Sequence, residues 1–218
     1  MREQVDTQAA LWAAILASGV YHGLNPGMGW PLAVAAGLTE RRGAAVVRTL
    51  APLAAGHLVS LVVVLLPFAA LTLVLDWSRE IRIAAGLGIV AFAALLLCYP
   101  RHPRWMARIR PGQVALWSFA VALLHGAGLM LVPMLLGLCG PSAPAQPLTG
   151  ADLVGNAGLA VAVAVAHTGA LVIAGGLLAF VTYRVVGLGI LTRSWFDLGR
   201  LWAGSLALAG AIGLWSAL

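Results

Sequence analysis

Charged side chains are scarce in this chain of 218 residues. They make up 9% of the sequence, whereas 61% of the residues are hydrophobic and the mean hydropathy is +0.97. Soluble globular domains carry about 25% charged residues, so an ordinary soluble domain is excluded. The long apolar stretches predict instead an all-α fold, a polytopic membrane helix bundle with the lipid bilayer as its surroundings.

Lysine is absent, so all thirteen basic residues are arginine, and only seven residues are acidic. The arginines lie in short segments between apolar stretches and not on one soluble face, so we expect no nucleic-acid partner. The two cysteines, Cys98 and Cys139, stand far apart without CxxC spacing. Neither a disulfide framework nor a thiol-redox motif is therefore indicated.

Six apolar stretches approach or exceed the length of about 20 residues that a membrane crossing needs. They are residues 10–38, 49–75, 83–99, 114–138, 153–182 and 201–217. Ten of the thirteen arginines fall in the alternate connecting segments 39–48, 100–113 and 183–200. Such segments mark the cytoplasmic side. We therefore expect one transmembrane domain over residues 1–218, with six transmembrane helices and both termini outside the cytoplasm (periplasmic or extracellular).

Four histidines lie inside these apolar stretches, where ionisable residues are costly and normally face an interior path or site. His22 opens a His-Gly pair and is followed 35 residues later by His57, and His125 opens a second such pair and is followed 42 residues later by His167. Each half holds three expected spans, so the second half starts from the opposite side. The pattern predicts a 3+3 inverted repeat, about residues 9–99 and 113–217, with its site near the midplane.

The residue types in these segments point to a transition-metal ion. Imidazole suits nickel, cobalt, copper and zinc, and thioether sulfur favours copper(I). No carboxylate lies within an apolar stretch, so we expect no magnesium or calcium site, because those ions prefer oxygen ligands. The candidate metal ligands are His22, His57, His125, His167 and Met28.

Proline and glycine predict breaks in the helices beside the histidines. Pro26 has no N–H for the carbonyl of His22, and Pro133 has none for the carbonyl of Leu129. With Gly27 next in the chain, residues 22–30 are expected to form a broken or re-entrant segment, which membrane proteins tolerate only where protein, water or an ion satisfies the backbone. Candidate substrate-binding residues nearby are Asn25, Ser60 and Met130.

The stretch Tyr21-His22-Gly23-Leu24-Asn25-Pro26-Gly27-Met28, followed by an Arg-rich turn and Gly56-His57-Leu58-Val59-Ser60, resembles the nickel/cobalt efflux (NicO-type) proteins of the LysE exporter superfamily. Their first span ends in a His-x-x-x-Pro-Gly-His pattern, and the match covers about the first 65 residues. Here Met28 stands in place of the second motif histidine, which opens the cargo to a softer ion. The resemblance implies transport in the cytoplasmic (inner) membrane of a bacterium.

Four interpretations follow from the sequence. The first is a transporter that moves a transition-metal cation past the four histidines. In the second, the cargo is a small organic solute or anion, the histidines relay protons and Asn25 binds the substrate. An intramembrane metal-dependent enzyme is disfavoured because a zinc-activated water usually needs a carboxylate base, so we expect no enzyme. A structural subunit of a larger complex stays open, and so does a homodimer.

Overall fold

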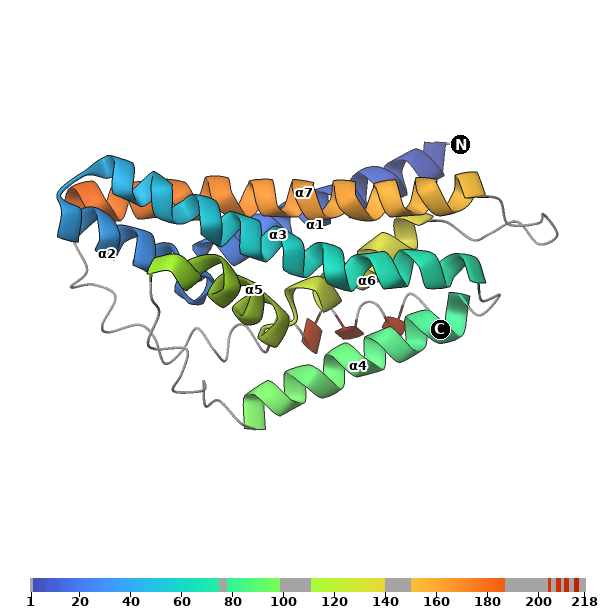
Figure 1. The fold of residues 1–218 in the computed structure, drawn as a ribbon. Helices are drawn as coiled ribbons and strands as arrows, with labels where there is room; N and C mark the ends of the chain where they lie inside the picture. The colour runs from blue at the N-terminus through green and yellow to red at the C-terminus, as the bar shows by residue number, and fades with distance from the viewer. Residues whose placement is uncertain are drawn as a thin grey trace.

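The structure, a computed structural model, describes residues 2–74, 78–98, 111–139 and 150–186, together with a few helical positions between 204 and 215. Within these ranges every regular element is helical, which agrees with the predicted all-α class. Figure 1 shows long helices lying side by side, with the amino terminus and the beginning of α7 at the same end. Most of the expected span 201–217 and most of the segments 100–113, 139–152 and 183–200 lie outside the described residues.

The first half begins with an interrupted helix. α1 (Arg2–Leu24) ends just before a 3-10 turn, η1 (Pro26–Met28), and α2 (Trp30–Glu40) then continues the chain. Gly29, with φ of 97°, joins η1 to α2 in a left-handed conformation that side chains other than glycine rarely adopt. The stretch 10–38 is therefore two helices with a turn between them.

The rest of the first half is a long helix and a shorter one. α3 (Gly43–Val74) is 32 residues long, and α4 (Ser78–Cys98) follows it. Only Arg41 and Arg42 separate α2 from α3, so the connection predicted over residues 39–48 is shorter than expected. Arg48 lies within α3 and forms an ion pair with Glu40 at the end of α2.

The second half repeats the order of a bent helix followed by a long one. A short 3-10 turn, η3 (Pro111–Gln113), leads into α5 (Val114–Leu124), and α6 (Ala127–Cys139) follows at a bend of 63°. α7 (Gly150–Val181) has 32 residues, as α3 does, and ends in a π-helical turn, η4 (Thr182–Val186). The bend lies at His125 and Gly126, where Gly126 has φ of 68°.

Pro133 does not break its helix. It lies inside α6, and α3 likewise continues through Pro52 and Pro67. The helix break predicted at Pro133 is thus absent, and the bend of this half lies at Gly126 instead. Helices packed among other helices tolerate an interior proline when neighbouring groups satisfy the freed carbonyl.

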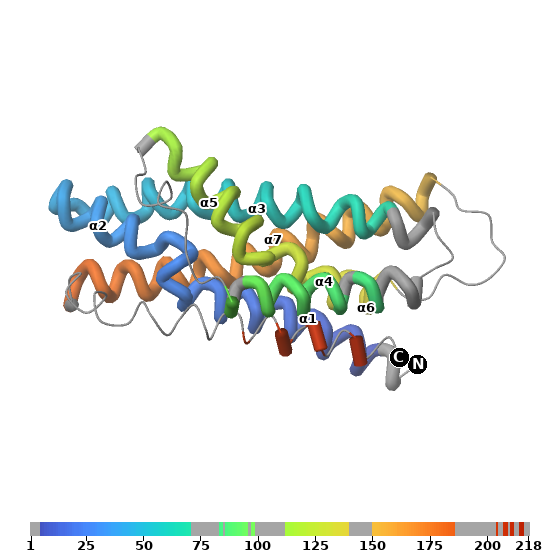
Figure 2. The backbone as a smooth tube through the Cα atoms, turned by 90° about the horizontal axis from the view of Figure 1, so that it is seen from below, coloured from blue at the N-terminus to red at the C-terminus, as the bar shows by residue number. Residues whose placement is uncertain are grey.

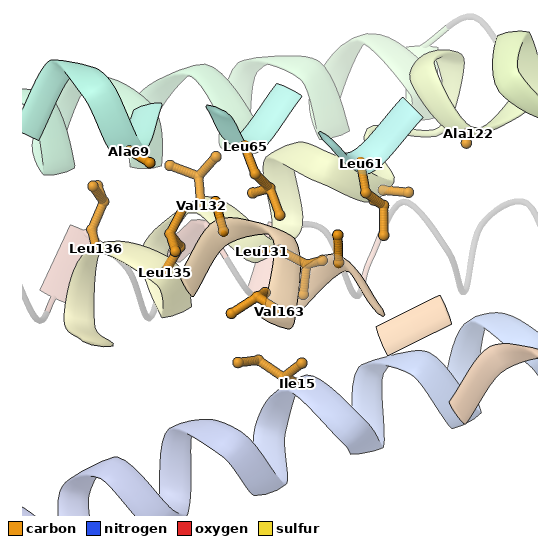
Figure 3. Packing of buried hydrophobic residues seen from close by; sticks show 13 residues of the cluster. Ile15, Leu61, Leu65, Ala69, Ala122, Leu131, Val132, Leu135, Leu136 and Val163 are labelled. Carbon is orange, nitrogen blue, oxygen red and sulfur yellow. The ribbon is translucent and has the colours of Figure 1, made fainter. Parts of the chain in front are cut away.

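α3 and α7 are the central helices of the bundle. The most extensive contacts join α1 to α7, α3 to α5 and α3 to α7, while α4 packs on α6 at the edge (Figures 1 and 2). The largest apolar core lies where α1, α3, α6 and α7 meet. Figure 3 shows Leu61, Leu131 and Val163 facing one another in that core, with Ile15 contributed by α1.

Two helices are long and apolar enough to cross a membrane, within Gly43–Ala70 and Gly150–Val185. The bent pair α5 and α6 makes a third if it counts as one span. At a rise of 1.5 Å per residue, α3 and α7 are each about 48 Å long, more than the hydrocarbon core of about 30 Å.

Candidate functional site

Three of the four predicted histidines form a cluster at the centre of the bundle. His22 comes from α1, His57 from α3 and His167 from α7, and their exposed fractions are 0%, 2% and 0%. The ring centroids are 4.8 Å apart for His22 and His167, 5.6 Å for His57 and His167, and 5.9 Å for His22 and His57. We call these three residues the histidine cluster.

Glycine on α1 allows the close packing that brings the cluster together. A β-carbon on Gly19 would overlap the backbone carbonyl of His167, and one on Gly23 would overlap that of Leu171. On the facing helix, a β-carbon on Gly175 would lie 2.9 Å from the carbonyl oxygen of Gly23. α1 and α7 can therefore approach backbone to backbone, as small residues allow in membrane helix pairs.

The histidines that precede the two helix breaks are held in the same way. Nδ1 of His22 lies 3.0 Å from the carbonyl oxygen of Ser18, and Nδ1 of His125 lies 2.9 Å from that of Val121. A carbonyl oxygen only accepts, so each ring donates through Nδ1–H. In the neutral ring, Nε2 then carries the lone pair that can bind a proton or a metal ion.

His125 lies at the meeting point of the two breaks and is partly buried. A β-carbon on Gly27 would lie 3.2 Å from Oδ1 of Asn25 and 3.8 Å from Nε2 of His125. His125 also interacts electrostatically with His22. The turn of the first half thus faces the bend of the second half, and His125 stands beside the histidine cluster.

Asn25 has a structural task at this turn. Its side-chain Oδ1 accepts a hydrogen bond of 2.9 Å from the backbone N–H of Gly27 and so caps η1. Asparagine is a favoured residue at such a position because its oxygen replaces a missing backbone acceptor.

A small cavity adjoins the cluster. It measures about 20 Å³, and His57, Met28 and Trp30 are among the side chains that line it. Such a volume is close to the smallest that can hold one water molecule. Met28 is 7% exposed and packs against Val121, so its thioether is held beside this cavity.

Several buried polar atoms around the cluster have no hydrogen-bond partner in the described part of the chain. They include Nε2 of His57 and His167, Oγ of Ser60, Oγ1 of Thr168 and Nε1 of Trp30. An unsatisfied buried polar group costs about 1–3 kcal/mol, and each such group calls for an explanation such as a bound water or ion. Two of these atoms, Nε2 of His57 and Nε1 of Trp30, belong to side chains that line the cavity, whose other lining residues are apolar.

Met130 lies in a different part of the bundle. It packs with Ile89 and Ala93 of α4, so the structure does not bring it to the cavity that Met28 and His57 line. Among the described residues, no group of three or more His, Cys, Asp or Glu side chains is arranged as a preformed metal site. The three rings are close neighbours without a coordination geometry.

Ser18 is the residue that the sequence prediction missed. Its backbone carbonyl contacts His22, and its hydroxyl lies 2.9 Å from Nδ1 of His167. The spacing of four residues between Ser18 and His22 on one helix could have suggested the first contact. The second depends on the packing of α1 against α7, which no local pattern indicates.

Comparisons with family models, with curated proteins and with solved structures found no match to this chain.

Proposed function

We propose that this protein is an integral membrane transporter that moves a transition-metal cation through the histidine cluster. The observation that carries the proposal is the contact of three buried imidazoles from three helices beside a cavity of about 20 Å³. Imidazole nitrogen is a ligand for nickel, cobalt, copper and zinc. Met28 adds a thioether at the same cavity, and His125 lies beside the histidine cluster.

The distribution of apolar side chains supports a membrane location. Large apolar residues on the outer faces of the long helices are exposed, for example Ile173 at 73% and Leu177 at 66% on α7. The histidines, by contrast, are buried inside. Soluble proteins rarely expose apolar surface on this scale, whereas lipid covers such surface at no cost.

The packing of the helices supports the proposed inverted repeat. α1, the first helix of one half, packs on α7 of the other half, and α5 packs in the same reciprocal way on α3. Figure 1 shows α1 and α3 running in opposite directions, and α5–α6 and α7 each running opposite to their counterparts. This arrangement is expected of two three-span units inserted in opposite orientations.

We propose six spans in the cytoplasmic membrane of a bacterium, with both termini outside. The distribution of arginine supports this orientation, since ten of thirteen fall in the segments assigned to the cytoplasm.

The size of the cavity favours a metal ion over a small organic solute. A space of about 20 Å³ accommodates one water-sized guest, whereas ligand sites for organic molecules enclose about 300–1,000 Å³. A cation can bind to all three imidazoles only if the rings turn toward a common point. We propose that this rotation of the side chains takes place during the transport cycle.

Metal binding and flux in the purified protein test the proposal. The wild type in proteoliposomes should move one or more of nickel, cobalt, copper(I) and zinc, and His57→Ala should abolish both bound metal and flux. His102→Ala, at the histidine that the sequence places among loop arginines, serves as the matched control and should behave as wild type. Wild-type protein that neither binds nor moves any of the four ions would refute the proposal.

A further inference from the structure

Ser18 contacts two of the three rings of the histidine cluster. Its backbone carbonyl oxygen lies 3.0 Å from Nδ1 of His22, and its Oγ lies 2.9 Å from Nδ1 of His167. The side chain is 5% exposed. One residue of α1 therefore touches a histidine of its own helix and a histidine of α7.

The hydrogen bonds of the Ser18 hydroxyl determine whether it donates to His167 or accepts from it. Oγ lies 2.8 Å from the carbonyl oxygen of Ile15, which can only accept. A serine hydroxyl has a single hydrogen and two lone pairs, so the bond to Ile15 uses the hydrogen. In the contact with His167, Oγ is then the acceptor and Nδ1–H of the ring is the donor.

The same orientation holds for His22. Its Nδ1 faces the carbonyl oxygen of Ser18, so this ring also donates through Nδ1–H. Both neutral rings consequently have the lone pair on Nε2, and Nε2 of His167 is buried without a hydrogen-bond partner among the described residues. A second hydrogen bond that fixes tautomer and ring orientation is the usual support of a metal-binding histidine.

We infer that Ser18 is the positioning residue of the histidine cluster: its hydroxyl holds His167, and its carbonyl holds His22, in the tautomer that presents Nε2 to the cargo. The inference rests on the proposed function in one respect, namely that the Nε2 lone pairs of His22 and His167 bind the transported cation. The orientation of the rings is a property of the empty protein and can be measured without any metal.

A matched pair of serine substitutions separates positioning from packing. Ser18→Ala removes the hydroxyl and keeps the carbonyl, so His167 loses the hydroxyl acceptor, while the backbone carbonyl of Ile15, which also interacts with His167, stays in place. Ser118→Ala removes another buried hydroxyl that bridges two helices, from α5 to the carbonyl oxygen of Leu53 on α3 at 2.7 Å. Ser118 is 4% exposed, which makes the two sites closely comparable.

The first measurement is the ¹⁵N resonance of the ring nitrogens in metal-free protein, which distinguishes the two neutral tautomers. In wild type and Ser118→Ala, His22 and His167 should be protonated on Nδ1. In Ser18→Ala, His167 should populate the Nε2–H form while His22 stays unchanged. His167 that remains fully protonated on Nδ1 in Ser18→Ala would overturn the inference.

The second measurement is metal affinity. Loss of a hydrogen bond behind a histidine ligand lowers metal affinity about 10–100-fold, so Ser18→Ala should show a loss in this range and Ser118→Ala should not. An equal loss in both variants would mean that the hydroxyls act only through packing and would overturn the inference. If the wild type binds no metal, the proposed function fails, while the tautomer measurement still decides the role of Ser18.

Discussion

Protons and metal ions compete for the same ring nitrogen atoms of the histidine cluster. A neutral imidazole binds a metal ion through the lone pair of one ring nitrogen, and a protonated ring has no such lone pair, so affinity falls at a pH low enough to protonate the rings. We expect the affinity of the purified protein to fall as the pH is lowered, by up to about tenfold per pH unit for each ring that must lose a proton, and to recover when the pH is raised. Equilibrium dialysis across a pH series measures this.

The pH effect should depend on the number of rings. A variant that lacks one ring of the cluster, such as His167→Ala, should bind more weakly and with a shallower dependence on pH, whereas His102→Ala should follow the wild type. Affinity that stays constant down to a pH at which the rings are protonated would contradict ligation by histidine.

Met28 is the side chain best placed to set the preference among metals. It lines the cavity together with His57, and thioether sulfur favours copper(I) while imidazole suits nickel and cobalt. Met28→His should therefore raise the ratio of nickel or cobalt affinity to copper(I) affinity, by about tenfold, the scale of changes beside a bound metal. Competition titrations of the purified variants give this ratio.

Met130→His is the control for this prediction. Met130 packs on α4 with Ile89 and Ala93, away from the cavity, so the same substitution there should leave the ratio at the wild-type value. An identical shift in both variants would show that the added histidine acts without the cavity.

At the residue scale the sequence was a good guide to which side chains converge and a poor guide to how they are held. His22, His57 and His167 stand out as ionisable groups in apolar stretches, and the structure brings these three together. Met28 and Met130 look alike in the sequence, yet only Met28 lines the cavity. The face that a thioether presents depends on how each helix is rotated in the bundle, and this follows from tertiary packing.

Among the helices, the two interruptions show the limits of reading breaks from proline. Asn25, Pro26 and Gly29 act together, because a side-chain cap, a missing N–H and a left-handed glycine all fall within one turn. Pro133 stands alone inside α6 and the helix continues through it. The second bend is formed at Gly126, whose positive φ could not be foreseen in a chain with 26 glycines.

The crossing of α3 and α5 depends on Gly56. A β-carbon at this position would overlap the backbone carbonyl of Ala115 on α5, and backbone cannot move aside as a flexible side chain can. Gly56→Ala should lower the free energy of unfolding by about 1–3 kcal/mol, the usual cost of overpacking. Thermal or denaturant unfolding in detergent measures the change.

Gly169→Ala is the matched control at an exposed position inside α7, where an added β-carbon meets no atom of the described residues within 4 Å. It should be neutral or stabilising by up to about 1 kcal/mol, because alanine favours the helix over glycine. Equal destabilisation of both variants would contradict a specific contact at Gly56.

Over the whole molecule, the described core is mostly apolar, as in soluble proteins, but the outer faces of the long helices are apolar too. The histidine cluster lies between α1, α3 and α7, while the outer faces of α3 and α7 expose residues such as Val63 and Ile173. Two halves that pack reciprocally place their long helices at the centre, so one histidine from each long helix reaches the cluster. The orientation of the protein in the membrane then determines which end of the helix bundle faces the cytoplasm.

The two native cysteines test that orientation. Cys98 ends α4 and is exposed, and Cys139 ends α6 and is partly exposed. In the six-span arrangement Cys98 precedes the arginine-rich segment 100–113 on the cytoplasmic side, and Cys139 begins the segment on the opposite side, which lacks arginine up to Asp152.

A thiol reagent that cannot cross membranes should therefore label Cys98→Ser cells, which retain Cys139, before lysis, because the outer thiol faces the reagent directly. Cys139→Ser cells, which retain Cys98, should be labelled only after lysis. Labelling after solubilisation sets the full value for each variant. Identical accessibility of both cysteines in intact cells would mean that the ends of α4 and α6 share one side, which the six-span inverted repeat forbids.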